Sequence, residues 1–355
     1  MKSYIICCRN SGELMRECVE KSYGHIRYEL PFIGALCVDV PEKNTAAVLK
    51  LRGITAATED MKVTKFEAQE SSKSCMGNAD AGSLGRGVSI AVLDTGTHPH
   101  YDLIKPCSRL LFFKDFVNSR TAPYDDDGHG THVSGIAAGN GFSGAPKGIA
   151  PEASIVSLKV LDSDGSGNVS DILAAMQWIC DNHKKYNIRV VNLSLGMTYD
   201  GSLRIDPLHL GVGALYKRGI TVVAAGGNSG PAAKTISSPG NSPYVLTAGC
   251  CGKAGVSEFS SRGPAGTYMK PDLVACGEDI CSLAPGKTAT AIQSGTSMSA
   301  PAVSGAAACL YSAYPQLTAC QVKKILMSAT VPFDDEDRNS QGYGRLDTEM
   351  LKSLI

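Results

Sequence analysis

Short apolar runs alternate with amphipathic stretches along most of the chain after about residue 87. The apolar runs are rich in Val, Ile and Leu, as is typical of parallel strands buried on both faces; they cover 88–93, 155–161, 190–195, 221–225 and 245–248. Stretches with helical spacing lie between or after them and cover 170–179, 208–216, 300–314 and 318–328. This alternation predicts an α/β fold with three layers, a mainly parallel sheet with helices on both faces.

The first 66 residues have a different pattern, in which two helices are set among four strands. Strand-like runs cover 3–9, 26–30, 33–40 and 61–66, with helices expected between Ser11 and Gly24 and between Pro41 and Gly53. The order β-α-β-β-α-β is the ferredoxin-like arrangement, so a small α+β domain is expected before the larger one. The predicted domains are 1–68, a polar linker over 69–86, and 87–355.

Composition narrows the function classes. Lys plus Arg and Asp plus Glu both number 34, so the chain has no global basic field for nucleic acid or an anionic membrane. No apolar run reaches the roughly 18 residues of a membrane helix. The 13 cysteines include no CxxC pair and favour reduced thiols. Because the apolar run Tyr4–Cys8 is too short for a secretory leader, a cytoplasmic location is favoured over secretion unless a leader was removed.

Polar residues bounded by glycine occur at three places where a strand ends or a helix begins. Asp94 is followed by Thr-Gly, His129 lies in Gly-His-Gly-Thr-His-Val (128–133), and Ser297 lies in Gly-Thr-Ser-Met-Ser-Ala-Pro (295–301). A serine hydroxyl becomes a nucleophile when a base takes its proton and a carboxylate orients that base. Asp, His and Ser in this chain order are one known way to supply the set.

Through these three segments, and over about residues 87–344, the chain resembles the subtilisin-like serine proteases, the subtilases. The resemblance implies that Asp94, His129 and Ser297 are the catalytic triad of a serine endopeptidase. It also implies an acyl-enzyme, a peptide or protein substrate, and no cofactor for the chemistry. Asn228, just after the run 221–225, matches the family's oxyanion asparagine.

The same resemblance suggests where substrate binds. Ser194, Leu195 and Gly196 match a strand end whose backbone pairs with an extended peptide. Gly226 stands where the family commonly has Ala in the wall of the primary specificity pocket. Without the acidic cluster by which proprotein convertases select Arg or Lys, a hydrophobic or broad preference is favoured. The run Asp125-Asp126-Asp127 is interpreted as a solvated loop.

In position, size and element order, residues 3–66 look like the propeptide inhibitors that precede many subtilases. The resemblance implies a pro-domain that is a partner of the catalytic domain and lays its C-terminal end in the cleft. The enzyme is then a self-processing proenzyme, and we expect cleavage between Phe66 and Gly77. An accessory domain with no inhibitory role is the alternative.

A structural calcium ion is compatible with the sequence, but no metal ligand is assigned. Asp102 and the loop 140–147 approximate calcium segments of the family, although Phe142 stands where an oxygen ligand would help. His132 is expected to be a structural neighbour of His129.

Two other function classes stay open. One is a catalytically silent pseudoprotease that acts as a binding or regulatory module, although such proteins usually lose a triad member. The other is a nucleotide-binding protein, for which Gly-Gly-Asn-Ser-Gly at 226–230 lacks the required spacing.

Overall fold

The computed structural model describes residues 1–9, 12–66, 68, 85–198 and 205–355. The predicted linker 69–86 therefore lies outside the described residues except for its last two. In the larger part, the strands of the central sheet are β6 (Ser89–Asp94), β7 (Leu110–Asp115), β8 (Ser154–Lys159), β10 (Ile188–Leu193), β12 (Thr221–Ala225), β13 (Leu246–Cys251), β14 (Leu273–Cys276), β17 (Thr330–Val331) and β18 (Arg345–Leu346).

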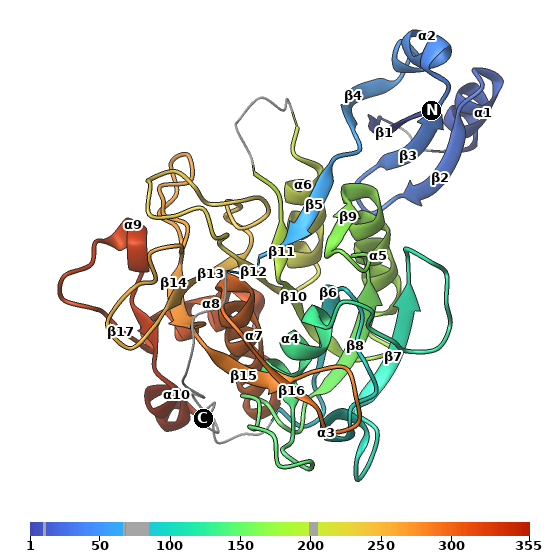
Figure 1. The fold of residues 1–355 in the computed structure, drawn as a ribbon. Coiled ribbons are helices and arrows are strands. Elements are labelled where there is room, and N and C mark those ends of the chain that lie inside the picture. The colour runs from blue at the N-terminus through green and yellow to red at the C-terminus, as the bar shows by residue number, and fades with distance from the viewer. Residues whose placement is uncertain (10–11, 67, 69–84, 199–204) are drawn as a thin grey trace.

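These nine strands form one sheet in the order β17-β18-β14-β13-β12-β10-β6-β8-β7. All neighbours from β18 to β7 are parallel, and β17 pairs antiparallel with β18. The prediction of an α/β fold with a mostly parallel sheet is confirmed (Figure 1).

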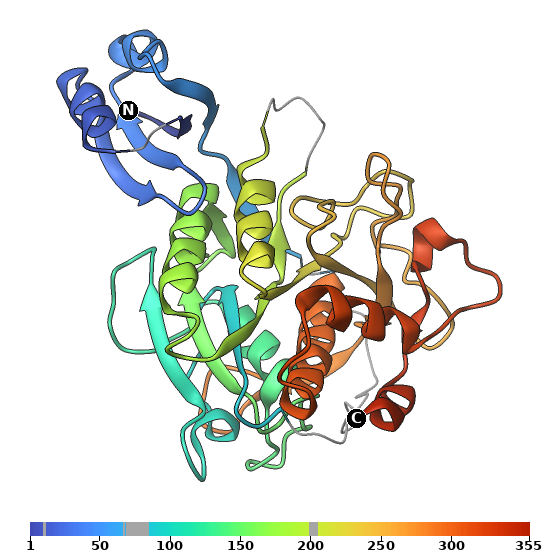
Figure 2. The same cartoon turned by 180° about the vertical axis from the view of Figure 1, so that it is seen from behind.

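Helices pack on both faces of this sheet (Figure 2). Alternate residues of β6 face opposite clusters, with Ile90 and Val92 on one side and Ala91 and Leu93 on the other. The helices are α3 (Tyr101–Ile104), α4 (His129–Ala138), α5 (Val169–Asn182), α6 (Pro207–Lys217), α7 (Thr296–Ala313), α8 (Ala319–Ser328), α9 (Arg338–Gln341) and α10 (Thr348–Leu354). α4, α7 and α8 contribute to the first cluster, and α5 and α6 to the second.

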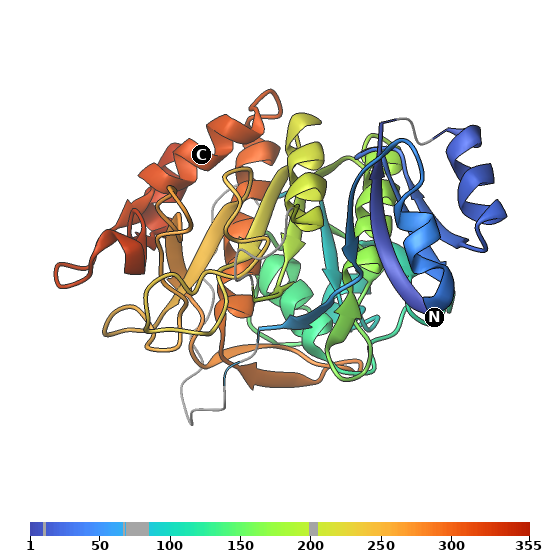
Figure 3. The ribbon, with the colours of Figure 1, turned by 90° about the horizontal axis from the view of Figure 1, so that it is seen from above.

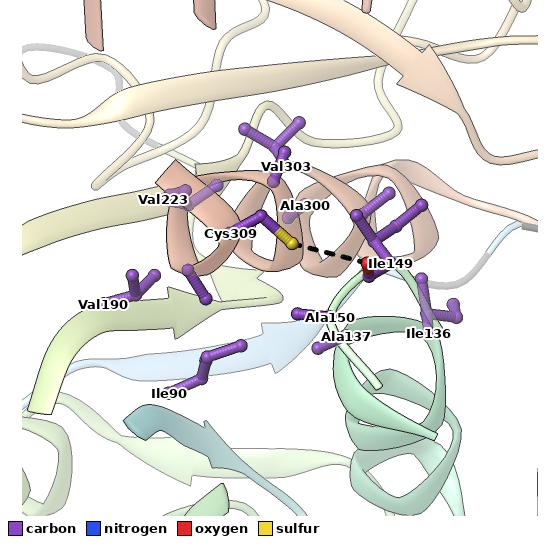
Figure 4. Close-up of a cluster of buried hydrophobic side chains, with 14 of the residues drawn as sticks. Ile90, Ile136, Ala137, Ile149, Ala150, Val190, Val223, Ala300, Val303 and Cys309 are labelled. Carbon is purple, nitrogen blue, oxygen red and sulfur yellow. Dashed lines mark hydrogen bonds between the residues drawn. The ribbon is translucent and has the colours of Figure 1, made fainter. Parts of the chain in front are cut away.

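Helix α7 is buried over almost its whole length. Its small side chains, such as Ala300, let it lie close to sheet residues such as Val190 and Val223 (Figure 4). Near its end, Cys309 Sγ donates to Ile149 O at 3.5 Å. Within the described part of the chain, no helix combines the length and apolar character needed to cross a membrane.

The N-terminal part has its own sheet, β2-β3-β1-β4, in which all neighbours are antiparallel. Its elements are β1 (Lys2–Cys8), α1 (Glu13–Lys21), β2 (His25–Leu30), β3 (Ala35–Val40), α2 (Thr45–Leu49) after a 3₁₀ turn (Glu42–Asn44), and β4 (Ile54–Glu59). A separate apolar cluster lies under this sheet and includes Ile6, Val19 and Val38.

The fourth strand of the small sheet is Ile54–Glu59, and not 61–66 as predicted. The segment predicted as that strand forms β5 (Lys62–Lys65), which leaves the small sheet and enters the larger part (Figures 1 and 3). There it lies between β11 (Leu195–Gly196) and β9 (Ser166–Asn168) in a three-stranded sheet.

Several strands of the larger part were not predicted. Strands β7 and β14 and the hairpin of β15 (Ile280–Leu283) and β16 (Thr290–Gln293) belong to this group. β7 lies at the edge of the sheet and is partly exposed, and its apolar run of Leu110–Phe113 is followed at once by Lys114.

Candidate active site

The carboxylate of Asp94, the last residue of β6, contacts the imidazole of His129, the first residue of α4. Asp94 Oδ1 lies 2.7 Å from His129 Nδ1, and both side chains are fully buried. Burial disfavours the imidazolium, but the adjacent Asp94 carboxylate outweighs it and raises the pKa of His129 above its ordinary 6.5. The pair therefore provides an oriented imidazole that is more basic than a free one.

Ser297 is the second residue of α7, a helix that packs against α4. Its Oγ donates to Ser194 O at 2.9 Å and accepts from Phe66 N at 3.2 Å. His129 Nε2 has no hydrogen-bond partner among the described residues. The structure thus joins two of the three predicted residues by a hydrogen bond, and Ser297 Oγ would have to leave Ser194 O to bond His129.

A buried hydrogen-bond chain holds the backbone of Ser297. Pro301 has no N–H, so the carbonyl of Ser297, four residues earlier, loses its helical donor. Ser194 Oγ donates to that carbonyl at 2.9 Å and itself accepts from Asn192 Nδ2 at 3.0 Å. The residue at 194 therefore contacts both the hydroxyl and the carbonyl of Ser297.

The amide of Asn228 points its donor into the site. Its Oδ1 accepts from Thr296 N at 3.1 Å and from Thr296 Oγ1 at 2.9 Å, which fixes the orientation of the amide. Nδ2 is buried and has no partner among the described residues. A Cβ added to Gly295 would lie 2.4 Å from Phe66 O and 3.1 Å from Asn228 Nδ2, so this carbonyl and this amide lie beside the same backbone position.

Strand β5 lies beside these residues. Leu195 pairs antiparallel with Lys65, and Gly196 with Thr64. On the other side, β5 pairs antiparallel with β9. A segment of the chain itself thus lies as an extended strand along Leu195 and Gly196.

Gly226 lies at the end of β12 and its N–H donates to Ala248 O at 2.9 Å. The atoms nearest to a Cβ added there belong to Ala248, Ile236 and Thr247. None of these nearest atoms belongs to Phe66, so they do not place Gly226 in contact with the Phe66 side chain.

The interpretation of Asp125-Asp126-Asp127 as a solvated loop is wrong for Asp125 and Asp127, whereas Asp126 is exposed. Asp125 is buried and accepts from Gly128 N, Thr131 N and two side chains. Asp126 Oδ1 pairs with the buried Nζ of Lys159 at 2.6 Å. The Asp127 carboxylate pairs with Lys65 Nζ at 2.9 and 2.8 Å. The sequence did contain a signal for these contacts, because the three carboxylates stand immediately before the start of a buried helix. Charges that are removed from water need partners.

The segments that approximate a calcium site are satisfied by the protein itself. Asp102 accepts from Gly141 N at 3.0 Å and from Ser143 N at 2.7 Å. Both oxygens of the Asp102 carboxylate are therefore engaged by backbone N–H groups of this loop. No cluster of three His, Cys, Asp or Glu side chains suited to a metal occurs within the described residues. His132 Nε2 lies 3.0 Å from Ile280 O.

Comparison with known proteins gives consistent matches. A sequence model of the subtilase family matches residues 85–344. Serine protease AprX of Bacillus subtilis is 39% identical over 297 residues, which are 75% of this chain and 66% of AprX. Subtilisin E of Bacillus subtilis is 31% identical over 359 residues, which cover 97% of this chain and 88% of that protein. The thermostable alkaline protease of Halalkalibacterium halodurans is 30% identical over 328 residues, with 91% and 85% covered.

Proposed function

The chain belongs to the subtilase family and is a serine-type endopeptidase, and from this premise we propose that Asp94, His129 and Ser297 are its catalytic triad. Subtilases need no cofactor for catalysis. The 2.7 Å contact between Asp94 Oδ1 and His129 Nδ1 supports the proposal, because it leaves Nε2 to act as the base.

The chemistry follows from the arrangement of these groups. Ser297 Oγ gives its proton to His129 Nε2 as it bonds to the carbonyl carbon of the substrate, and Asp94 stabilises the imidazolium. His129 then gives that proton to the leaving amine, and the peptide C–N bond breaks to leave an acyl-enzyme on Ser297. Water, deprotonated by the same imidazole, releases the acid.

Asn228 is proposed as the donor to the negative oxygen of the tetrahedral intermediate. Its Nδ2 is buried without a partner among the described residues, and its orientation is fixed by Thr296. The N–H of Ser297 lies in the first turn of α7, where helical N–H groups lack intrahelical acceptors. Two fixed donors near the reacting carbonyl stabilise the transition state more than mobile water does.

We further propose that residues 1–66 form a ferredoxin-like pro-domain and that the enzyme cleaves its own chain after Phe66. The antiparallel order β2-β3-β1-β4 supports the first part. The observation that carries the second is the seating of Phe66, whose N–H donates to Ser297 Oγ at 3.2 Å. The predicted cleavage range between Phe66 and Gly77 otherwise lies almost entirely outside the described residues.

A fluorophosphonate probe and mass spectrometry test the proposal together. Wild type, allowed to process and then diluted until fragment 1–66 dissociates, should be labelled at Ser297 and should yield a mature N-terminus at residue 67. Ser297→Ala, treated in the same way, should be unlabelled and stay full length. Ser299→Ala is the matched control, because Ser299 Oγ donates to Ala275 O at 2.9 Å and should leave labelling intact. Equal processing of wild type and Ser297→Ala would rule out self-cleavage. A folded wild type that resists the probe would instead indicate a pseudoprotease.

A further inference from the structure

The side chain next to the seated Phe66 enters an acidic site beside the catalytic histidine. Lys65 Nζ contacts both oxygens of Asp127, at 2.9 and 2.8 Å. The Lys65 side chain is 20% exposed and that of Asp127 is 9% exposed, so the pair is largely removed from water. An unpartnered carboxylate at that depth is unfavourable, which makes the nature of the residue at position 65 energetically important.

The Asp127 carboxylate is held in place by groups other than the lysine. Its Oδ1 accepts from His129 N at 3.0 Å, in the first turn of α4. Backbone N–H groups and the helix dipole favour a negative charge at that end. The acceptor is therefore preorganised for an incoming cation.

A second feature fits the long stem of the lysine. Lys65 N donates to Gly165 O at 3.0 Å, and the side chain runs directly over Gly165. A Cβ added to Gly165 would lie 2.6–2.7 Å from Cγ, Cδ and Cε of Lys65. Glycine at this position thus provides space for an unbranched chain that leads to Asp127.

The residue whose carbonyl would be attacked is seated against a different surface. A Cβ added to Gly196 would lie 2.8 Å from Cζ and 3.0 Å from Cε2 of Phe66, so the ring lies against the glycine backbone. Phe66 also packs on the apolar cluster that contains α7. This surface suits a flat apolar side chain.

We propose that Asp127 is a specificity-determining residue that selects a lysine or arginine immediately before the residue whose carbonyl is attacked. The preferred substrates are then polypeptides that contain a basic residue followed by an aromatic one, with cleavage after the aromatic. This inference rests on the proposed function, since it treats Lys65 and Phe66 as a seated substrate sequence. It refines the expectation of a hydrophobic or broad preference at the residue whose carbonyl is attacked, because Asp127 contacts the side chain of the residue before it.

The experiment compares fluorogenic peptides that carry Val-Thr-Lys-Phe, Val-Thr-Arg-Phe, Val-Thr-Ala-Phe or Val-Thr-Glu-Phe before the cleaved bond. The enzyme is the full chain after self-processing, diluted until fragment 1–66 dissociates, with active sites counted by fluorophosphonate titration. We expect kcat/KM for the Lys and Arg peptides to exceed that for the Ala peptide by about 10- to 100-fold, with the Glu peptide slowest. In Asp127→Asn the Lys-to-Ala ratio should fall close to 1, and Asp127→Glu should retain much of it.

The Lys-to-Ala ratio compares kcat/KM for two peptides on the same variant. A change in folding or in the basicity of His129 therefore affects both values and cancels. Asp164→Asn is the matched control, because Asp164 is an exposed carboxylate in the neighbouring loop and its removal should leave the ratio unchanged. A labelled, active wild type with a Lys-to-Ala ratio near 1 would overturn the proposal, as would an unchanged ratio in Asp127→Asn. Absence of labelling at Ser297 would instead overturn the proposed function, and the inference with it.

Discussion

Burial and the nearby charges have opposite effects on the pKa of His129. Burial lowers its pKa, while the Asp94 carboxylate raises it by charge and by hydrogen bonding. Two weaker effects come from the groups beside it, since Lys65 lowers the pKa and Asp127 raises it. The net direction is upward, so the neutral, proton-accepting form is reached at a higher pH than in a free imidazole.

This balance predicts the acid limb of the pH–rate profile. Activity requires neutral His129, so kcat/KM for a peptide with Ala before Phe should rise with pH through an apparent pKa above 6.5. In Asp127→Asn a charge that stabilises the imidazolium is lost, and the limb should move to lower pH. Initial rates between pH 4 and 9 in a constant-ionic-strength buffer measure the acid limb of wild type and of Asp127→Asn. A limb that stays in place or moves to higher pH in the variant would contradict the assignment.

At this scale the residues proposed to carry out the chemistry have a clearer signal in the sequence than those proposed to orient substrate. Asp94, His129, Asn228 and Ser297 lie in glycine-bounded segments whose local pattern is distinctive. The partnership of Asp127 with Lys65 joins residues 62 positions apart, and no local spacing encodes it.

Among the elements that build the site, helix α4 has its first turn held by the carboxylate of Asp125. Asp125 Oδ2 accepts from Thr131 N at 2.8 Å and Thr131 Oγ1 at 2.6 Å, and Oδ1 accepts from Gly128 N at 2.8 Å. Oδ1 also accepts from Thr95 Oγ1 at 2.8 Å, which ties the helix to the turn after β6. The element that presents the imidazole is therefore attached to the strand that presents its carboxylate.

Replacing Asp125 should loosen this connection. Burial raises the pKa of this carboxyl, but the hydrogen bonds from Thr131 and Gly128 lower it below its ordinary 3.8. Because the folded-state pKa is depressed, the group stabilises the fold fully above pH 3.8 and the contribution is lost as pH falls through the folded value. Asp125→Asn, in the inactive Ser297→Ala background, should lose about 2–3 kcal/mol at pH 7.

Unfolding monitored by circular dichroism from pH 7 down to pH 3 measures this effect. The gap between Asp125→Asn and its parent should shrink below pH 3.8, since protonation removes the same bonds from the parent. Asp164→Asn, an exposed neighbour, should match the parent throughout. A gap that is constant with pH would contradict the role given to the charge.

Element prediction succeeded for strands buried on both faces and failed where pairing partners are distant. The runs at β6, β8, β10 and β12 are rich in Val, Ile, Leu and Ala and almost wholly buried, so their type was clear. β5 has a pattern compatible with any sheet edge, and its partners β11 and β9 lie more than 100 residues away. Local sequence cannot state which edge such a strand joins.

In the molecule as a whole, the N-terminal part supplies the N-terminal cap of helix α5 in the larger part. The N-cap residue of α5, Asn168, makes no side-chain cap bond. Asp60 supplies one instead, because its Oδ1 accepts from Ser170 N at 2.9 Å and its Oδ2 from Ser170 Oγ at 2.5 Å. Arg27 also pairs with Asp60, and Tyr28 Oη donates to Asp171 Oδ1 at 2.9 Å.

This polar contact is backed by apolar packing. Ile5, Leu30 and Ala35 of the small sheet belong to the same buried cluster as residues of α5 and α6. Together with the pairing of β5, these contacts do not depend on the peptide bond after Phe66. Cleavage there should therefore leave the fragment 1–66 bound, with β5 still paired along Leu195 and Gly196.

Asp60→Ala should weaken this retention. The substitution removes the cap of α5 and leaves Arg27 without its partner, so we expect the fragment to bind about 10- to 100-fold more weakly after self-cleavage. Full-length chain is allowed to process, and size-exclusion chromatography with a peptide assay then reports bound fragment and free activity. Glu59→Ala is the matched control, because Glu59 is 63% exposed and contacts Lys2 of its own sheet at 3.5 Å. Since the bound fragment covers Leu195 and Gly196, the proposed substrate-binding residues, Asp60→Ala should gain free activity at dilutions where wild type and Glu59→Ala remain inhibited. Equal retention in all three proteins would show that the strand pairing and apolar packing alone hold the fragment.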